Sequence, residues 1–308
     1  MFTGHILNCF LSGEVWTGND ETGAGALNRI PLRIGGTDAE LIQGPAFLLG
    51  SVSEFEGKQV HTTDLVVPAA TPADLPTCLS LLSGIVELLM FATVSEVRRG
   101  GYLMPGADPF ERSDAVVGVT LHGIPVLELA DGANTKRYLE SVWPKYVLLR
   151  NARRLDIAFE YFVLSQKGGQ PLEVKAAITF ILLEHLKHTY ARSVGYPFEN
   201  GWNWRRRNAA GKPEGRLGFK ILLSEMFGAV GMTPSLEAAV DLRNELVHSG
   251  MTALSFDALH VLLSECQDLA REYLLRLLAY TGPYIPFSEP NSERILETSA
   301  AAEKTPLP

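Results

Sequence analysis

The chain has 308 residues, enough for two domains, and 46% of them are hydrophobic, enough for a substantial core. Its formal net charge is −8, from 35 acidic and 27 basic side chains, which excludes bulk binding of polyanions and leaves only a local patch for nucleic acid. Cys9, Cys78 and Cys266 lie far apart without a C-x-x-C pair, so no disulfide framework or cysteine-rich zinc site is expected. A reducing, cytoplasmic location fits best, and the N-terminus lacks the basic region of a signal peptide.

Residues 1–132 are predicted to form a strand-rich α+β domain of unknown role. Alternating apolar residues predict strands over 2–15, 30–34, 46–55 and 58–67, with Glu56-Gly57 as a hairpin turn. The intervening segment 17–28 is expected to be a flexible loop. The glycines at 23–25 and 35–36 lack the spacing of a phosphate-binding loop, and we expect them to mark turns.

A long apolar helix is predicted to follow Thr71-Pro72-Ala73-Asp74 and to continue to about Arg98, where Gly100-Gly101 stops it. Its most apolar run covers only 16 residues, 79–94, and contains Glu87. A membrane span needs about 20 residues, so we expect a buried helix and no membrane association. Segments 115–121 and 124–129 then predict a pair of strands.

Residues 133–287 are predicted to form an all-α bundle. Helical patterns cover 135–166, with a possible interruption at Pro144, and then 172–194 and 217–230. A fourth helix begins at Thr233, and a fifth runs from Ser255 to about Tyr280. A long loop is expected over 195–215. The tail 288–308, rich in Ser, Glu, Ala and Pro, is expected to be disordered.

The segment Asp241-Leu-Arg-Asn-Glu-Leu-Val-His-Ser-Gly250 contains the main candidate site. Asn244 and His248 are one helical turn apart and share a face, whereas Arg243 lies about 140° around the helix from His248 and approaches from the flank. A fixed cation, an amide and a group that titrates near neutral pH can together act on a phosphate ester. Alternatively, Arg243 pairs with an acid of its own helix (Glu237, Asp241 or Glu245) and His248 only caps the helix C-terminus.

This segment, between helix pairs and one long closing helix, resembles the HEPN superfamily (higher eukaryotes and prokaryotes nucleotide-binding domain), and most closely its ApeA-like proteins, over residues 136–285. The family signature is an arginine, four to six residues and a histidine, often with a polar residue after the arginine, which here are Arg243, His248 and Asn244. The resemblance implies a helical bundle that dimerises and brings two motifs into one cleft. Active members are metal-independent endoribonucleases of toxin–antitoxin, abortive-infection and CRISPR-linked defence. Ser249-Gly250 departs from the tyrosine of the nucleotidylating subgroup.

A second candidate site is the basic and aromatic part of the 195–215 loop. Between 201 and 220 there are six basic residues and only Glu214 as an acid. Aromatic rings beside cations can stack on RNA bases while the cations contact phosphates. The residues expected to contact RNA are Trp202, Trp204, Arg205, Arg206, Arg207 and Lys212. Alternatively, the loop is solvated and its tryptophans anchor it to the bundle.

Two further polar clusters are expected to be solvated helix faces. In Glu184-His-Leu-Lys-His188, Glu184 and His188 are one helical turn apart. The segment is not the H-E-x-x-H motif of zinc proteases, so no metal is assigned to it. Its residues could still lie at the edge of the cleft that the HEPN resemblance implies. Arg150, Arg153 and Arg154 form the other cluster.

The sequence therefore predicts a cytoplasmic, metal-independent endoribonuclease without cofactor. It would act as a homodimer, cleave RNA to a 2′,3′-cyclic phosphate, and belong to a prokaryotic defence or toxin-like system with a possible antitoxin or defence partner. The alternatives are a non-catalytic module that binds nucleotide, RNA or protein, and a structural subunit of a larger assembly.

Overall fold

The structure is a computed structural model, which describes residues 1–19, 24–44, 55, 57–108, 110–111, 123–128 and 131–297. The chain divides into two compact units, Met1–Pro144 with Gln166–Gly168, and Lys145–Ser165 with Gly169–Pro308. The division falls inside a helix, at Pro144, and not at residue 132. The expected α+β class is confirmed, but the second unit is not purely helical.

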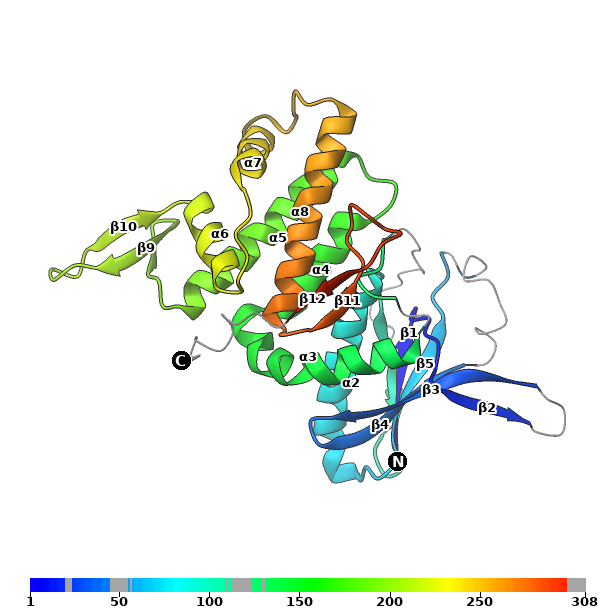
Figure 1. The fold of residues 1–308 in the computed structure, drawn as a ribbon. Coiled ribbons are helices and arrows are strands. Elements are labelled where there is room, and N and C mark those ends of the chain that lie inside the picture. The colour runs from blue at the N-terminus through cyan, green and yellow to red at the C-terminus, as the bar shows by residue number, and fades with distance from the viewer. Residues whose placement is uncertain are drawn as a thin grey trace. The chain divides into compact units, whose positions relative to one another are not determined.

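The first unit contains a seven-stranded antiparallel sheet in the order β2-β3-β4-β5-β1-β6-β7 (Figure 1). Its strands are β1 Phe2–Leu7, β2 Val15–Asn19, β3 Ala24–Ile34, β4 Thr37–Gln43, β5 His61–Val67, β6 Arg98–Leu103 and β7 Phe110–Glu111. Gly35 and Gly36, with φ of 59° and 82°, form the two-residue turn between β3 and β4, as predicted.

Helix α2 (Leu75–Thr93) packs against β1 and β6 and supplies much of the core of this unit. It follows a short 3₁₀ turn, Pro72–Asp74, whose start is fixed by a reciprocal capping box between Thr71 and Asp74. Gly4 on β1 lies close to α2, because a Cβ there would lie 2.8 Å from Leu82 Cδ2 and would displace that side chain. The face of β1 that carries Gly4 is therefore the face that α2 covers.

By length and composition, Pro72–Thr93 is the one membrane-span candidate in the described part of the chain. Within its most apolar window, 61% of the residues are buried inside the protein. The segment thus has the packing of a core helix, as the sequence predicted.

Several predictions for the first unit are wrong. The expected 17–28 loop is largely β2 and β3, which pair through their backbones with Gly18 opposite Gly25, so Gly25 lies in a strand and not in a turn. Strand β4 was not predicted, because buried Gln43 and charged neighbours obscure its alternation. Strand β5 begins at His61 and not at residue 58.

The end of the apolar helix also differs from the prediction. α2 ends at Thr93, because Val94 takes a left-handed conformation with φ of 50°, and Gly100-Gly101 lie in β6. Residues 124–128 form no strand. Instead, Val126 N donates to the carbonyl oxygen of Ala92, in the last turn of α2. The predicted strand over 115–121, and that over 46–55 except Phe55, lie outside the described residues.

The second unit contains most of the helices: α3 (Gly132–Arg153, shared with the first unit), α4 Leu155–Gln166, α5 Leu172–Ser193, α6 Phe219–Gly228, α7 Glu237–Ser249 and α8 Phe256–Leu277. α5 is the central helix of the group, with contacts to α6, α7 and α8. α3 continues through Pro144, so the interruption that the sequence left open there does not occur. The break comes instead at Arg154, where φ is 46°.

Two small sheets replace segments that were predicted to be irregular. The expected 195–215 loop forms β8 Phe198–Glu199, β9 Trp202–Arg207 and β10 Pro213–Leu217, and Gly211 with φ of 74° lies in the β9–β10 turn. The chain after α8 forms a hairpin of β11 Gly282–Tyr284 and β12 Arg294–Leu296. Residues 288–297 are thus ordered, contrary to the prediction, and 298–308 lie outside the described residues.

Buried polar side chains link the helices of the second unit. Arg153 was expected on a solvated face but is only 4% exposed, and its Nη2 donates to Tyr273 Oη at 2.6 Å and to Leu186 O at 3.2 Å. Gln267 Nε2 donates to the hydroxyls of Ser165 and Thr179 at 2.9 and 2.7 Å. The predicted solvated cluster is confirmed for Arg154 alone, which is exposed and pairs with Asp156.

The three cysteines are buried as free thiols. Burial raises the pKa of Cys9 and of Cys266 to about 12, and it raises the pKa of Cys78 as well. Because the thiolate is the reactive form, we expect none of the three to react with an aromatic disulfide reagent at about pH 8 until the protein is unfolded in urea. The release of one thiol equivalent from the native protein within seconds would contradict this.

Candidate functional site

Helix α7 presents the predicted motif on a partly buried helix. Ala239, Leu242 and Leu246 form its buried face, and it contacts α5, α6 and α8. Gly250, with φ of 72°, ends the helix and donates its N–H to Leu246 O, the left-handed cap that the terminating glycine favours. The residues on the far side of α7 from the core are therefore exposed at its last turn.

Arg243 is held by a carboxylate from another helix. Its Nη2 lies 2.8 Å from Glu184 Oε1 of α5, its Nη1 donates to Asn244 Oδ1 at 3.0 Å, and its Cζ lies 5.1 Å from the centre of the Phe219 ring. Lys187 Nζ contacts the other oxygen of Glu184 at 2.6 Å. The guanidinium, 26% exposed, is thus fixed in orientation and has an amide beside it.

Among the described residues, the three acids of α7 that were the alternative partners of Arg243 form no ion pair with it. Glu237 pairs with Lys220, and this hydrogen bond lowers the pKa of its carboxyl group to about 2. Glu245 accepts from Thr252 Oγ1 at 2.7 Å and Ala253 N at 2.8 Å, which closes the α7–α8 turn and lowers its pKa. Asp241 is exposed and has no hydrogen bond to Arg243 in the structure. The predicted alternative of a pair within the helix is therefore wrong.

His248 lies in the last turn of α7 with its side chain exposed. Among the described residues, no hydrogen bond or ion pair joins His248 to Arg243, to Asn244 or to any other side chain. The structure therefore brings Arg243 and Asn244 into contact and leaves the imidazole free at the surface, one turn from Asn244. Its position also fits the predicted alternative of a basic residue at a helix C-terminus.

The neighbouring histidines of α5 lie on a face that is only partly exposed to solvent, and both make contacts with other parts of the second unit. His185 Nε2 lies 3.1 Å from Arg154 O, and His188 packs edge-on against Phe198 at 5.0 Å between ring centres. Burial lowers the pKa of both imidazoles. Since Glu184 binds Arg243 and Lys187, a metal pair of Glu184 with His188 is not supported.

The basic hairpin β9–β10 is strongly paired with acids. Arg205 pairs with Glu225, Arg206 Nε lies 3.0 Å from Glu214, and Arg207 Nη2 lies 2.8 Å from Glu199. The sequence count between 201 and 220 missed two of these acids, because they lie outside that window. The hairpin therefore offers less free positive charge than its sequence indicated.

The tryptophans of the hairpin are also engaged. Arg216 Cζ lies 3.0 Å from the centre of the Trp202 ring, so one face of that ring is covered, and Trp204 Nε1 donates to Glu199 O at 3.2 Å. Lys212 is exposed beside the β9–β10 turn. The contact of Trp204 lies within the small sheet and does not test the predicted anchoring to the bundle, and Lys212 has the exposed side chain best placed to meet a phosphate.

Large apolar side chains are exposed around the α7–α8 turn. Their exposed fractions range from 41% to 71%, and the residues are Val247, Met251, Leu254, Phe256 and Val261. They lie in the same short stretch of chain as His248. We call this set the α7–α8 apolar patch.

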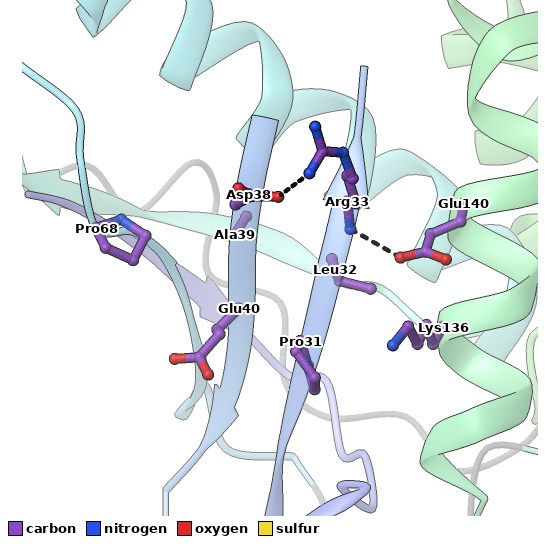
Figure 2. Close-up of a pocket in the computed structure, with 9 residues that line it drawn as sticks. All are labelled: Pro31, Leu32, Arg33, Asp38, Ala39, Glu40, Pro68, Lys136 and Glu140. Carbon is purple, nitrogen blue, oxygen red and sulfur yellow. Dashed lines mark hydrogen bonds and ion pairs between the residues drawn. The ribbon is translucent and has the colours of Figure 1, made fainter. Parts of the chain in front are cut away.

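The first unit has a shallow pocket of about 380 Å³ between strands β3 and β4 and helix α3 (Figure 2). Figure 2 shows Arg33 at its rim, with Nη1 3.3 Å from Asp38 Oδ1 and its backbone N–H donating to Glu140 Oε1 at 2.7 Å. Its lining contains three carboxylates and two cations, which already pair among themselves or with close neighbours. That charge balance does not suit a phosphate or a nucleic acid.

No protein-family model, curated protein or solved structure matches the chain. Sequence reasoning missed Lys187 and Phe219 as neighbours of Arg243, and it named Glu184 only as a possible rim residue. No local signal joins α5 to α7, because the ion pair spans 59 positions of the chain.

Proposed function

We propose that the chain is a HEPN-type, metal-independent endoribonuclease whose catalytic residues are Arg243, Asn244 and His248. The observation that supports this most is the fixed pair of Arg243 and Asn244 on the flank of α7, one turn from an exposed imidazole. A cation and an amide whose orientation is already set can stabilise the charge that develops on a phosphate. An exposed histidine can both accept and donate a proton near neutral pH.

In this mechanism the 2′-hydroxyl of the RNA attacks the adjacent phosphorus and the 5′-oxygen leaves. His248 exchanges the proton with the attacking or leaving oxygen. The planar guanidinium of Arg243 donates hydrogen bonds to the non-bridging oxygens of the phosphate, and Asn244 keeps the guanidinium in orientation. The products are a 2′,3′-cyclic phosphate and a 5′-hydroxyl, so no metal is needed to supply a nucleophile.

Glu184 acts here as a positioning residue. It binds Arg243 Nη2 at 2.8 Å and takes Lys187 on its other oxygen, so it orients the guanidinium from behind. A phosphate would compete with Glu184 for the same fork. Part of the binding free energy of RNA is then spent on loosening this pair.

We propose a homodimer that forms through the α7–α8 apolar patch and brings two copies of the motif together. Isolated apolar side chains are common on protein surfaces, but five in a stretch of fifteen residues beside the motif suit a contact that buries them. Replacing Phe256 with Glu should shift the mass measured by light scattering from dimer to monomer. Ile295→Glu, at a 73% exposed position outside the patch, is the matched control. A wild-type monomer at all concentrations would contradict the proposal.

The reaction class is tested with a labelled RNA in EDTA beside the same oligonucleotide with one 2′-deoxy nucleotide at the cleaved position. We expect cleavage of the all-ribose strand only, and a cyclic phosphate on the 3′ end of the upstream product. Cleavage of the 2′-deoxy position, or cleavage that stops in EDTA, would show a different chemistry.

A second function, a non-catalytic module that binds RNA, nucleotide or a protein, is favoured by one observation. The charge of Arg243 and of the hairpin arginines is already matched by carboxylates, as in a structural ion-pair network. Binding of RNA without any product, unchanged in His248→Ala, would favour this module. A defence setting and an antitoxin or defence partner stay predictions.

A further inference from the structure

Three metal-ligand side chains, His5, His61 and Asp64, meet on the sheet of the first unit. His5 on β1 and Asp64 on β5 are direct cross-strand partners, so their side chains leave the same face of the sheet. In a regular strand His61, three positions before Asp64, would point to the other face. The register of β1 against β5 shifts between Ile6 and Leu7, beside His61, and its ring reaches Asp64.

The ligand atoms of the three side chains already converge. His5 Nδ1 lies 2.8 Å from Asp64 Oδ1, and His61 Nε2 lies 2.7 Å from the same oxygen. The two imidazole rings are in edge contact, with centres 4.5 Å apart, and one ligand atom of each residue lies within 4.8 Å of the other two. Two ring nitrogens and a carboxylate oxygen thus face one point.

The direct strand partners of the cluster on the two neighbouring strands are uncharged. The residue opposite Asp64 on its other side is Ile42 of β4, and the residue opposite His5 on its other side is Gly101 of β6. The side chains of His5, Asp64 and His61 are 17%, 32% and 46% exposed, so the cluster is covered on one side and open to solvent on the other. A cation can enter from the open side and keep water as a further ligand.

We propose that His5, His61 and Asp64 bind a divalent first-row transition-metal cation of the kind that imidazole prefers, such as Zn²⁺. Two imidazoles and one carboxylate with open positions are a ligand set that suits Zn²⁺, Fe²⁺, Co²⁺ or Ni²⁺. Ca²⁺ and Mg²⁺ prefer all-oxygen ligands and should not compete. Hydrogen bonds to Asp64 already turn one ring nitrogen of each histidine toward the same carboxylate oxygen.

The rearrangement that binding requires is small. Bonds of about 2.0–2.1 Å in a tetrahedral site place ligand atoms about 3.3 Å apart. The two hydrogen-bonded pairs are now 2.7 and 2.8 Å apart, so each opens by about half an ångström. The ring nitrogens that coordinate the cation carry no proton, so the protons now in the hydrogen bonds to Asp64 pass to the other ring nitrogen or to solvent, and the carboxylate oxygen becomes a ligand. The sequence predicted no metal here, because a separation of 56 positions between His5 and His61 gives no spacing motif.

The test is calorimetric titration of the full, tag-free chain, stripped with chelator, with Zn²⁺ and separately with Mg²⁺. We expect about one equivalent of Zn²⁺ and no Mg²⁺ binding, and Co²⁺ should give the visible absorption of a low-coordinate site. His61→Ala, at a half-exposed position that should fold normally, should weaken Zn²⁺ binding by 100-fold or more, and Asp64→Asn should weaken it as well.

His248→Ala is the matched control, because it removes a histidine of the second unit, and its Zn²⁺ binding should equal that of the wild type. The metal site and the RNA chemistry are separable, since cleavage is assayed in EDTA and does not require these three residues. The absence of Zn²⁺ binding by the wild type, or equal binding by wild type and a His5→Ala/His61→Ala variant, would overturn the proposal.

Discussion

Replacing His248 with alanine is expected to lower the rate of RNA cleavage by about 10²–10⁴-fold. The reason is that imidazole is the one side chain of the motif that can act as a general acid or base, whereas a guanidinium serves only as a cation. Because His248 is exposed and makes no described side-chain contact, the substitution should leave the fold intact. The measurement is single-turnover cleavage of an end-labelled RNA in EDTA, with the fold checked by circular dichroism.

His61→Ala is the control for this experiment. It removes a surface histidine of the first unit that takes no part in the proposed cleavage, so its rate should equal that of the wild type. Equal rates for His248→Ala and His61→Ala would mean that the imidazole on α7 does not act in the reaction.

The largest loss of stability is expected from Arg271→Ala. The Arg271 side chain is fully buried, donates Nη1 to Ile285 O, and lies over the Phe162 ring at 5.8 Å and the Phe287 ring at 6.0 Å. Burial lowers the pKa of its guanidinium to about 10, so it remains charged at neutral pH. Truncation leaves a cavity and a buried carbonyl without this donor, and we expect a loss of about 3–5 kcal/mol in the free energy of unfolding.

Arg271→Met separates the two causes. It keeps most of the volume and removes only the donor and the buried charge, so the expected loss is about 1–3 kcal/mol. Arg206→Ala, at a 71% exposed arginine of the β9 strand, should change the stability by less than about 0.5 kcal/mol. Urea unfolding measures all three, and an Arg271→Ala variant as stable as Arg206→Ala would show that the buried arginine does not hold the C-terminal hairpin.

The helices of the second unit were predictable, because their apolar stripes have a helical period and clear ends. Gly250 ends α7 and Ser255 begins α8, where its Oγ accepts from Ala258 N, as their residue types favour. The strands were harder to predict from the sequence. The second half of β3 was predicted as the strand over 30–34, but β2 and the first half of β3 lack a regular apolar alternation, and β9 and β10 carry arginines outward.

The candidate site was predictable only in part. The motif on α7 follows from local spacing, but the partner of Arg243 does not, since Glu184 reaches it from α5 through packing. The same limit applies to Arg153, which the sequence assigns to the surface and the bundle buries against Tyr273. The His5, His61 and Asp64 cluster also depends on strand register, which no local pattern reveals.

The most direct test of the nuclease proposal compares wild type with the double variant Arg243→Ala/His248→Ala on one labelled RNA in EDTA. We predict cyclic-phosphate products from the wild type, and cleavage by the double variant slowed to about the rate of His248→Ala alone, because the effects of residues that act as one unit are not additive. Equal product from both proteins, or no product from the wild type at any protein concentration, would contradict the proposal.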